Sequence, residues 1–441
     1  VCPGCHTTLA GLGEDINIDK IPLDDPDVFQ MIADGETTAV FQMESYGMTQ
    51  LAMDIGIENI DEVSACIALY RPGPLGSNFH KQFAEAKFSG QLVENVIHED
   101  MRDLLKDTYG VVVFQEQLIE LAMHYAGYSA AEGDTFRKAI GKKDRAILDQ
   151  QESSFKSRMK EHGYGKVANP MWDMIIKFAE YAFNRAHTAA YAKLAYQTAW
   201  LKYYYPAQYG AGCIVGLKED SILDYFKYLQ DVGVTVLPPD INKSDTRART
   251  IPSPDGDRSN DSLILGLGAV AGCGEEFCNG IVEVRRDGGD FEDLFDFTER
   301  VVAGGVRINI SNFSNLITAG ALDNYSFGAS REAVRLLSDD ILNSSRDASK
   351  EVGGGVDLFS FEDIPELDPW RETARQLRES KARLSDIQDM SLQRGVIGFF
   401  VGAHPMESLL RYKRQVISRY PEVKTAYSVT DELNLNRGYR F

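Results

Sequence analysis

The sequence predicts a mainly α-helical, multi-domain protein, in which a helical domain precedes a small α-helical domain with a short β element. Three observations predict this class. Apolar residues recur every three or four positions through most of residues 27–209, which is the period of a helix with one buried face. The β-like runs are short and end at proline, as residues 234–237 do before Pro238. Finally, a length of 441 residues predicts two to four domains at roughly 100–200 residues each.

The first domain is expected to contain a series of one-sided helices. The periodic segments are residues 104–109, 115–125, 146–162, 170–181, 188–201 and 221–232. We expect Thr188 to be the N-cap of the helix that Pro206 ends, because a threonine hydroxyl can accept a bond from the first free amides. Residues 1–30 are rich in turn formers and are interpreted as a linker, so this domain is assigned to residues 31–240.

The smaller domain is assigned to residues 241–345. It opens on an exposed hairpin or loop at 246–262, which is dense in Asp, Ser, Pro and Gly, and the apolar residues 263–265 follow. Residues 344–355 are polar and glycine-rich and are interpreted as a linker, which begins a tail over residues 346–441.

Composition excludes several classes of protein. The longest apolar runs are shorter than the ~18 residues that span a membrane, so we expect no membrane partner. A formal net charge of −20 excludes an overall basic nucleic-acid coat and confines any such contact to local patches. Six cysteines in 441 residues are too few for a disulfide scaffold and indicate a reducing, cytoplasmic compartment.

The first residues contain a short metal-like pattern. Cys2, Cys5 and His6 fit the C-x-x-C-H haem-attachment pattern and could supply two or three zinc ligands. We expect no haem, because export and a distal axial ligand are not indicated. We do not expect zinc either unless another chain completes the site, and a plain turn is the preferred interpretation.

Two segments have the chemistry of phosphate binding. Residues 137–145 contain five cations and a single acid, Asp144. The cations are Arg137, Lys138, Lys142, Lys143 and Arg145. Such a cluster can hold a triphosphate or a nucleic-acid backbone, although a solvated helix face is the alternative. Asn184, Arg185 and His187 lie just before a predicted helix, where free amides and the helix dipole favour an anion; for His187 a packing role is an equal alternative.

A helix-hairpin-helix pattern follows in the second domain. Gly272, Cys273 and Gly274 lie between apolar residues 267–271 and a helix-like segment over 276–286. Glycines let the backbone approach a DNA phosphate, with amides of the second helix donating to it, and such contacts do not read sequence. A second, poorer hairpin lies within residues 316–331 and includes Gly320 and Arg331.

No segment predicts a catalytic metal site. Nucleotidyl transfer needs two metals held by converging carboxylates, and we find no D-x-D flanked by strand-like residues. Walker and nucleophile-elbow motifs are also missing from the sequence. We therefore assign no catalytic residue and no metal ligand within this chain.

Taken together, these features resemble the alpha subunit of bacterial DNA polymerase III, the C-family replicative DNA polymerase. The landmarks occur in family order as AVFQMES (39–45), ALYRPGPL (68–75), YGVVVFQEQ (109–117), FRKAIGKK (136–143), FNRAHTAAY (183–191) and LPPDIN (237–242). The resemblance continues through the Gly272–Gly274 hairpin, AGALD (319–323) and GFFVGAHP (398–405), and so covers nearly the whole chain.

The resemblance implies that residues 31–240 are a helical fingers domain and 241–345 a duplex-binding, little-finger domain. It places one set of residues on the triphosphate side of the incoming dNTP: Arg71, Arg137, Lys138, Lys142, Lys143, Asn184, Arg185 and His187. It places a second set against primer-template DNA: Gly272, Cys273, Gly274, Gly320 and Arg331. Where the family carries a sliding-clamp motif, this chain has Val356, Asp357, Leu358 and Phe359 after Gly355 in place of a glutamine, so the clamp stays open as a partner.

The resemblance also implies what other chains must supply. Family members carry a PHP domain and a palm with metal-binding aspartates before the fingers, and an OB domain after the region of residues 398–405. We therefore expect a separate palm-bearing chain to hold Mg²⁺, this chain to be inactive alone, and the setting to be a bacterial nucleoid or a phage-infected bacterial cell. The alternative is a non-catalytic DNA-binding or replisome-interaction module derived from the polymerase.

Overall fold

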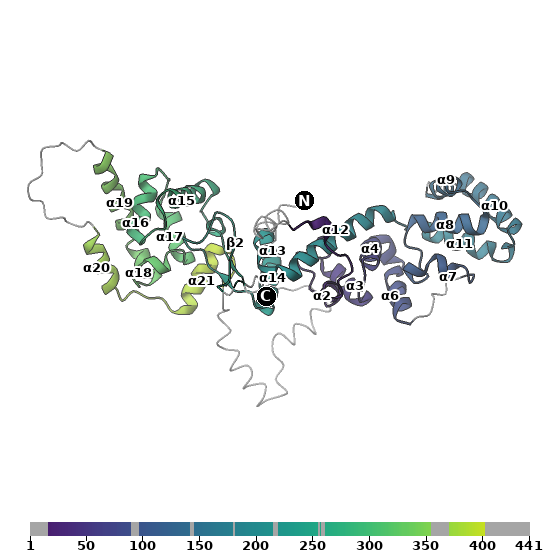
Figure 1. Ribbon diagram of the computed structural model, residues 1–441, viewed down its shortest axis with the longest axis horizontal. Coiled ribbons are helices and arrows are strands. Elements are labelled where there is room, and N and C mark those ends of the chain that lie inside the picture. Colours follow the sequence, from purple (N-terminus) through teal and green to yellow (C-terminus); the bar gives the residue numbers. More distant parts are fainter. Residues whose placement is uncertain are drawn as a thin grey trace, which may run out of the picture. The chain divides into compact units, whose positions relative to one another are not determined.

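The computed structural model describes residues 16–89, 97–141, 145–179, 181–214, 219–254, 256, 261–353 and 370–401. The chain forms two compact units, Val1–Val232 and Gly233–Phe441, whereas the sequence placed a boundary near residue 240. Helices dominate both units (Figure 1), which confirms the mainly α-helical class.

The first unit begins with short helices. They are η1 (Ile18–Lys20), α2 (Pro26–Ala33), α3 (Tyr46–Ile55), α4 (Ile60–Leu69), α5 (Pro72–Gly76), α6 (Phe79–Ser89), α7 (Met101–Leu104) and η2 (Lys106–Thr108). Their starts follow from local chemistry, since α2 has an Asp25 cap with proline at its first position and α4 has an Asn59 cap. Residues 104–109 were predicted to be one helix; this was wrong, because Tyr109 and Gly110 both adopt left-handed φ values, of 52° and 82°.

A helical bundle follows in the same unit. It comprises α8 (Gln115–Ala126), α9 (Ala130–Gly141), α10 (Arg145–Glu161), η3 (Gly165–Val167) and α11 (Ala168–Ala179), which pack on one another. Buried Phe136 and Phe155 stack with ring centroids 5.2 Å apart at the centre of this bundle. The predicted helices at 115–125, 146–162 and 170–181 are therefore confirmed to within a few residues.

The long helix α12 (Arg185–Tyr204) organises the rest of the unit. It packs chiefly on α4 and α2, and Pro206 begins α13 (Pro206–Cys213), which contacts α14 (Glu219–Asp231). The cap predicted at Thr188 was wrong. Asn184 is the N-cap, and buried Thr188 instead donates its hydroxyl to the carbonyl of Arg185. Asn184 accepts its bond from the amide three residues on and starts the helix earlier.

The second unit carries the short β element. Strand β3 (Ser262–Ile264) pairs in parallel with β1 (Val236–Leu237) and antiparallel with β2 (Arg249–Ile251), so the hairpin at 246–262 is confirmed. The helices are η6 (Leu267–Ala269), α15 (Glu275–Gly288), α16 (Leu294–Ala303), α17 (Ile310–Ala319), η7 (Asp323–Tyr325), α18 (Arg331–Leu336), α19 (Ser338–Gly353), α20 (Arg371–Glu379) and α21 (Asp386–Ile397).

The linker expected from residue 344 was wrong over its first part, because α19 continues to Gly353. Buried Ile341, Leu342 and Ser345 form a narrow stripe on this helix, and the Ser345 hydroxyl lies 2.8 Å from that of Thr298 on α16. The polar residues that suggested a linker are the solvated face of a packed helix.

No helix in the described ranges is both long enough and apolar enough to cross a lipid bilayer.

Candidate functional site

The starts of α8 and α12 lie side by side in the first unit. Phe114 and Phe183 form a parallel bridge, in which the Phe183 amide donates to the Val113 carbonyl at 3.0 Å. The Gln115 amide donates to the Phe183 carbonyl at 2.8 Å. Two motifs about 70 residues apart in the sequence therefore meet at one place.

Gln115 connects this place to α9. Its Oε1 accepts from Nη1 of Arg137 at 2.9 Å, and its Nε2 donates to the Ala182 carbonyl at 3.2 Å. Asp134 in turn accepts from Arg137 at 2.8 Å and forms an ion pair with Nζ of Lys138 at 2.6 Å. The hydrogen bonds from Lys138 and Arg137 lower the pKa of the Asp134 carboxyl. The basic helix is thus tied to the start of α12 through one glutamine.

The side chain of Glu116, a residue of α8, lies at the N-terminal end of α12. Its carboxylate accepts from Asn184 Nδ2 and from the amide of Arg185, both at 2.9 Å. The Arg185 guanidinium lies 3.5 Å from Asp61 and 3.4 Å from Asp107. Since free amides and the helix dipole attract negative charge, an internal carboxylate already uses donors that an anionic ligand would need.

Arg71 holds the chain segment that leads into α12. Its Nη2 donates to the Tyr181 carbonyl and its Nε to the Ala68 carbonyl, both at 2.7 Å. Its guanidinium also lies 4.2 Å from the centroid of the Phe183 ring. Arg71 therefore fixes the segment from which Asn184 and Arg185 project.

An aromatic row runs along the exposed side of this site. The ring of His187 lies 5.4 Å from Phe183 and 4.4 Å from Tyr191, and Tyr191 lies 5.4 Å from Phe41. Positions 187 and 191 share one face of α12 because four residues are about one helical turn, and Phe183 lies just before the N-cap of this helix. We call Phe183, His187, Tyr191 and Phe41 the aromatic row; the His187 side chain is exposed and the other three are half-buried.

The structure brings most of the predicted nucleotide residues into one neighbourhood. Those linked there by hydrogen bonds, ion pairs or ring contacts are Arg71, Arg137, Lys138, Asn184, Arg185 and His187. Lys142 and Lys143 lie outside the described residues. Sequence reasoning assigned no role to Gln115 and Glu116, although their signal was present in the landmark block at 109–117.

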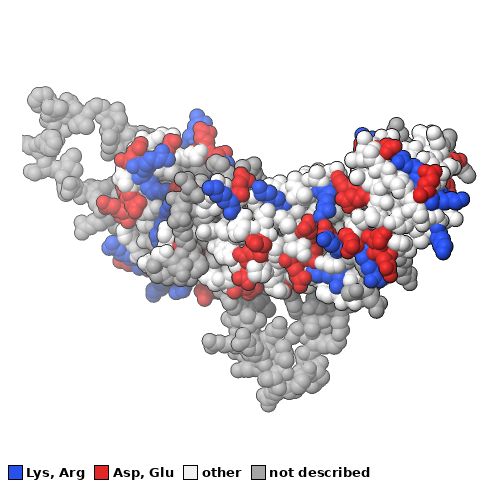
Figure 2. Space-filling view, turned by 45° about the vertical axis from the view of Figure 1, so that its right-hand side comes forward, with Lys and Arg blue, Asp and Glu red and all other residues white. Residues whose placement is uncertain are grey.

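The cations of this region are interspersed with acids. On the face that Figure 2 shows, blue Lys and Arg side chains alternate with red Asp and Glu over the described surface, and no broad basic patch forms there. This fits the net charge of −20 and means that any anion must be held by particular donors.

The first predicted hairpin in the second unit has the expected backbone geometry. Gly272 has a φ of +78°, and Gly274 is the N-cap of α15 without a side-chain cap hydrogen bond. Cys273 between them is buried, so the glycine backbone rather than a side chain faces solvent. Exposed Glu275 and Glu276 occupy the first turn of α15, so a phosphate would approach beside two carboxylates.

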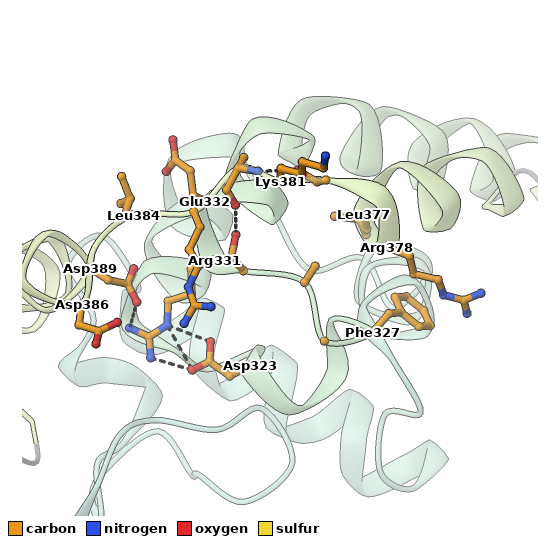
Figure 3. Close-up of a pocket in the computed structure, with 16 residues that line it drawn as sticks. Asp323, Phe327, Arg331, Glu332, Leu377, Arg378, Lys381, Leu384, Asp386 and Asp389 are labelled. Atoms are coloured by element: carbon orange, nitrogen blue, oxygen red, sulfur yellow. Dashed lines mark hydrogen bonds and ion pairs between the residues drawn. The ribbon is translucent and has the colours of Figure 1, made fainter.

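The second hairpin places Gly320 and Arg331 in contact. Gly320 ends α17 with a φ of +92°, where a side chain would collide with the Arg331 guanidinium. Arg331 donates to both carboxylate oxygens of Asp323 at 2.7–3.2 Å, and lies 3.3 Å from Asp389 of α21 (Figure 3). Two carboxylates thus engage the cation that the sequence predicted to face DNA.

A cavity of about 540 Å³ adjoins this hairpin. Its lining includes Arg331 and Asp389, and opposite them Phe327 lies below Arg378, with 5.4 Å between the guanidinium and the ring centroid. Figure 3 shows Arg378 and Lys381 at one end and the acidic side chains at the other. The cavity lining therefore carries acidic and basic side chains together.

Within the described residues no three His, Cys, Asp or Glu side chains are grouped so that they could hold a metal ion. Cys2, Cys5 and His6, and the clamp-motif residues Val356, Asp357, Leu358 and Phe359, lie outside the described residues.

Comparison with known proteins points to one family. Residues 6–163 match the family model of the bacterial DNA polymerase III alpha subunit finger domain, and residues 233–334 match the helix-hairpin-helix motif. DNA polymerase III subunit alpha of Mycobacterium tuberculosis (strain H37Rv) is 33% identical over 409 residues, which cover 91% of this chain and 33% of the relative.

Relatives from two other bacteria are also DNA polymerase III alpha subunits. The DNA polymerase III subunit alpha of Vibrio cholerae is 33% identical over 90% of this chain and 34% of its own length. That of Aquifex aeolicus is 33% identical over 93% of this chain and 32% of its own length. The chain therefore spans about a third of the curated relatives that it matches.

Proposed function

Because the chain belongs to the bacterial DNA polymerase III alpha-subunit family, we propose that it contributes incoming-dNTP and primer-template binding to template-directed DNA synthesis. The observation that carries this proposal is the convergence of α5, α8, α9 and the start of α12 on one site. Four of its members, Arg71, Arg137, Arg185 and His187, come from three separate sequence landmarks.

The proposed nucleotide site acts by electrostatics. Phosphoryl and nucleotidyl transfer spread negative charge over the phosphate oxygens, and fixed guanidinium groups stabilise that charge without covalent chemistry. Arg137 is held by Gln115 and Asp134, so it is oriented before an anion arrives. Lys138, Lys142 and Lys143 would add charge along the same helix and beyond it.

The proposed DNA site is the pair of hairpins in the second unit. The backbone at Gly272 and Gly274 can approach a phosphate because neither residue carries a side chain, and the α15 amides can donate to it. Such contacts position a duplex but do not select its sequence. Cys273 would contribute through its backbone, while Gly320 and Arg331 would form the second contact.

We further propose that a separate palm-bearing chain supplies the catalytic carboxylates. That chain would hold Mg²⁺, which supplies Lewis-acid activation of the 3′ hydroxyl and charge neutralisation when bound. This chain would be inactive alone, in the cytoplasm of a bacterium or a phage-infected bacterium, with a sliding clamp as a further partner through residues 356–359.

Primer extension by the mixed chains tests the nucleotide site. The variants are Arg137→Ala and the pair Lys142→Ala/Lys143→Ala, and we expect each to raise the dNTP KM about tenfold, which is ~1.4 kcal/mol of lost binding. The control is Lys160→Ala/Lys166→Ala, two exposed lysines of the same unit outside the site. An unchanged KM in the site variants would refute the assignment. Duplex binding without any dNTP effect would favour the non-catalytic module.

A further inference from the structure

A fully buried lysine lies in the last turn of α12, the helix whose start forms the proposed nucleotide site. Lys202 on α12 has 0% exposed surface, and its Nζ donates to the carbonyls of Glu36 at 2.6 Å and Thr38 at 3.0 Å. The ammonium also lies 4.0 Å from the centroid of the Tyr228 ring. Burying a charge costs several kcal/mol unless it is bonded, and here the bonds go to a turn rather than to a carboxylate.

The turn that Lys202 holds is strained. We call residues 36–42 the strained turn, because Ala39 and Gln42 adopt left-handed φ values of 63° and 61° although neither is glycine. Such residues cost about 1–2 kcal/mol each and persist only where the surroundings impose them. Strain of this kind is concentrated at functional sites.

Side chains of α12 and α13 impose this conformation together. Thr198 accepts from the Phe41 amide at 3.0 Å, and the Tyr209 hydroxyl donates to the Ala39 carbonyl at 2.6 Å. Lys202 donates to the carbonyls of Glu36 and Thr38, just before Ala39 in the chain. Buried side chains thus hold the strained turn at residues 36–38, at Ala39 and at Phe41.

The strained turn sets the position of the half-buried Phe41 side chain. Its ring lies 5.4 Å from Tyr191, which lies 4.4 Å from His187. The aromatic row therefore begins on a turn that buried polar side chains of α12 and α13 hold, and it ends beside Arg71 at Phe183. Displacing the turn would remove one end of the surface that flanks His187.

We propose that Lys202 is a positioning residue for the nucleotide site, holding the strained turn so that Phe41 packs against Tyr191 and keeps the His187 ring in place. The proposal rests on the nucleotide role proposed above for His187. It assigns Phe41 to the same site as a half-buried aromatic contact. Lys202 itself touches no ligand and acts through the backbone of residues 36–38.

The contacts explain why an apolar residue would not serve. A methionine at 202 could fill the same volume, but it would leave the carbonyls of Glu36 and Thr38 without their buried donor. Removing the buried amine would also relieve a desolvation cost, so we expect the turn to lose order without an equal loss of overall stability. If Lys202 were purely structural, its replacement would lower overall stability and the order of the turn together.

The test uses three variants of the full chain. Lys202→Met removes the ammonium, Tyr209→Phe removes one hydroxyl and keeps the ring, and Lys193→Met is the control. Lys193 lies on the same helix with 42% of its side chain exposed and pairs only with Asp19 among the described residues. Amide hydrogen exchange over residues 39–43 reports the turn, and primer extension with the palm-bearing chain reports dNTP KM and kcat.

We expect Lys202→Met and Tyr209→Phe to speed exchange over residues 39–43 and to raise dNTP KM about fivefold to tenfold, with kcat within twofold and Lys193→Met unchanged. Unchanged exchange in Lys202→Met would overturn the proposal, as would faster exchange with an unchanged KM. If the wild-type pair extends no primer, the proposed function fails, and the exchange result alone then decides whether Lys202 holds the turn.

Discussion

Replacing Arg71 by lysine tests how the proposed nucleotide site is built. The arginine donates to two backbone carbonyls at 2.7 Å and covers the Phe183 ring at 4.2 Å, so one planar group makes three contacts. Lysine keeps the charge but has no planar fork, and it can replace about one of the hydrogen bonds. A half-buried hydrogen bond from a charged donor contributes about 1–2 kcal/mol and the stacking ~0.5–1 kcal/mol, so we expect Arg71→Lys to cost ~2 kcal/mol.

Urea unfolding followed by a probe in the first unit measures this cost. With a slope of ~2 kcal/mol per molar urea, the midpoint should fall by about 1 M. Arg102→Lys is the matched control, because Arg102 is an exposed arginine of the same unit. A midpoint for Arg71→Lys within ~0.25 M of the wild type would refute the reasoning, because the three contacts would then contribute almost nothing.

Three further predictions concern other parts of the molecule. Burial lowers the pKa of Lys202 from 10.5 to about 7, so between these pH values the unfolded chain binds more protons than the folded chain. The unfolding free energy of the wild type should therefore rise from pH 7 to 9, by up to ~1.4 kcal/mol per pH unit. An equal rise in Lys202→Met would contradict this prediction. Gly272→Val places a branched side chain at a φ of +78° and should weaken duplex binding equally for all sequences, measured by anisotropy at several salt concentrations; an unaltered affinity would exclude the hairpin as a DNA contact. Glu116→Ala leaves Asn184 Nδ2 and the Arg185 amide without their acceptor, so exchange at the start of α12 should accelerate about tenfold, and equal exchange rates would show that the carboxylate does not stabilise this end.

Helical periodicity predicted the fold well where burial repeats along one face. The segments at 115–125 and 146–162 became α8 and α10 because each carries enough apolar residues to show the period. The same criterion failed for α19, whose buried face is confined to a few residues such as Ile341 and Ser345. Local capping chemistry was also ambiguous, since Asn184 and Thr188 are both good cap residues and only packing places Thr188 inside the helix.

The candidate site could be predicted by residue type but not by partner. The sequence singled out Arg137 and Arg185 as phosphate ligands, yet it could not show that Asp134 and Glu116 would lie against them. Asp134 is three residues from Arg137 on the same helix. Glu116 is far from Arg185 in the sequence, so that pairing depends on tertiary packing. Lys202 gave no sequence signal at all, because a lysine within an aromatic helix is usually a solvated one.

We propose that these 441 residues supply the nucleotide- and DNA-binding part of a polymerase whose catalytic carboxylates lie in a palm domain outside them. Primer extension measured with this chain alone, with a palm-bearing alpha-subunit chain alone, and with both together tests it most directly. We expect primer extension only when both chains are present. Extension by this chain alone would contradict it, and so would extension by the palm-bearing chain at a rate that this chain does not change.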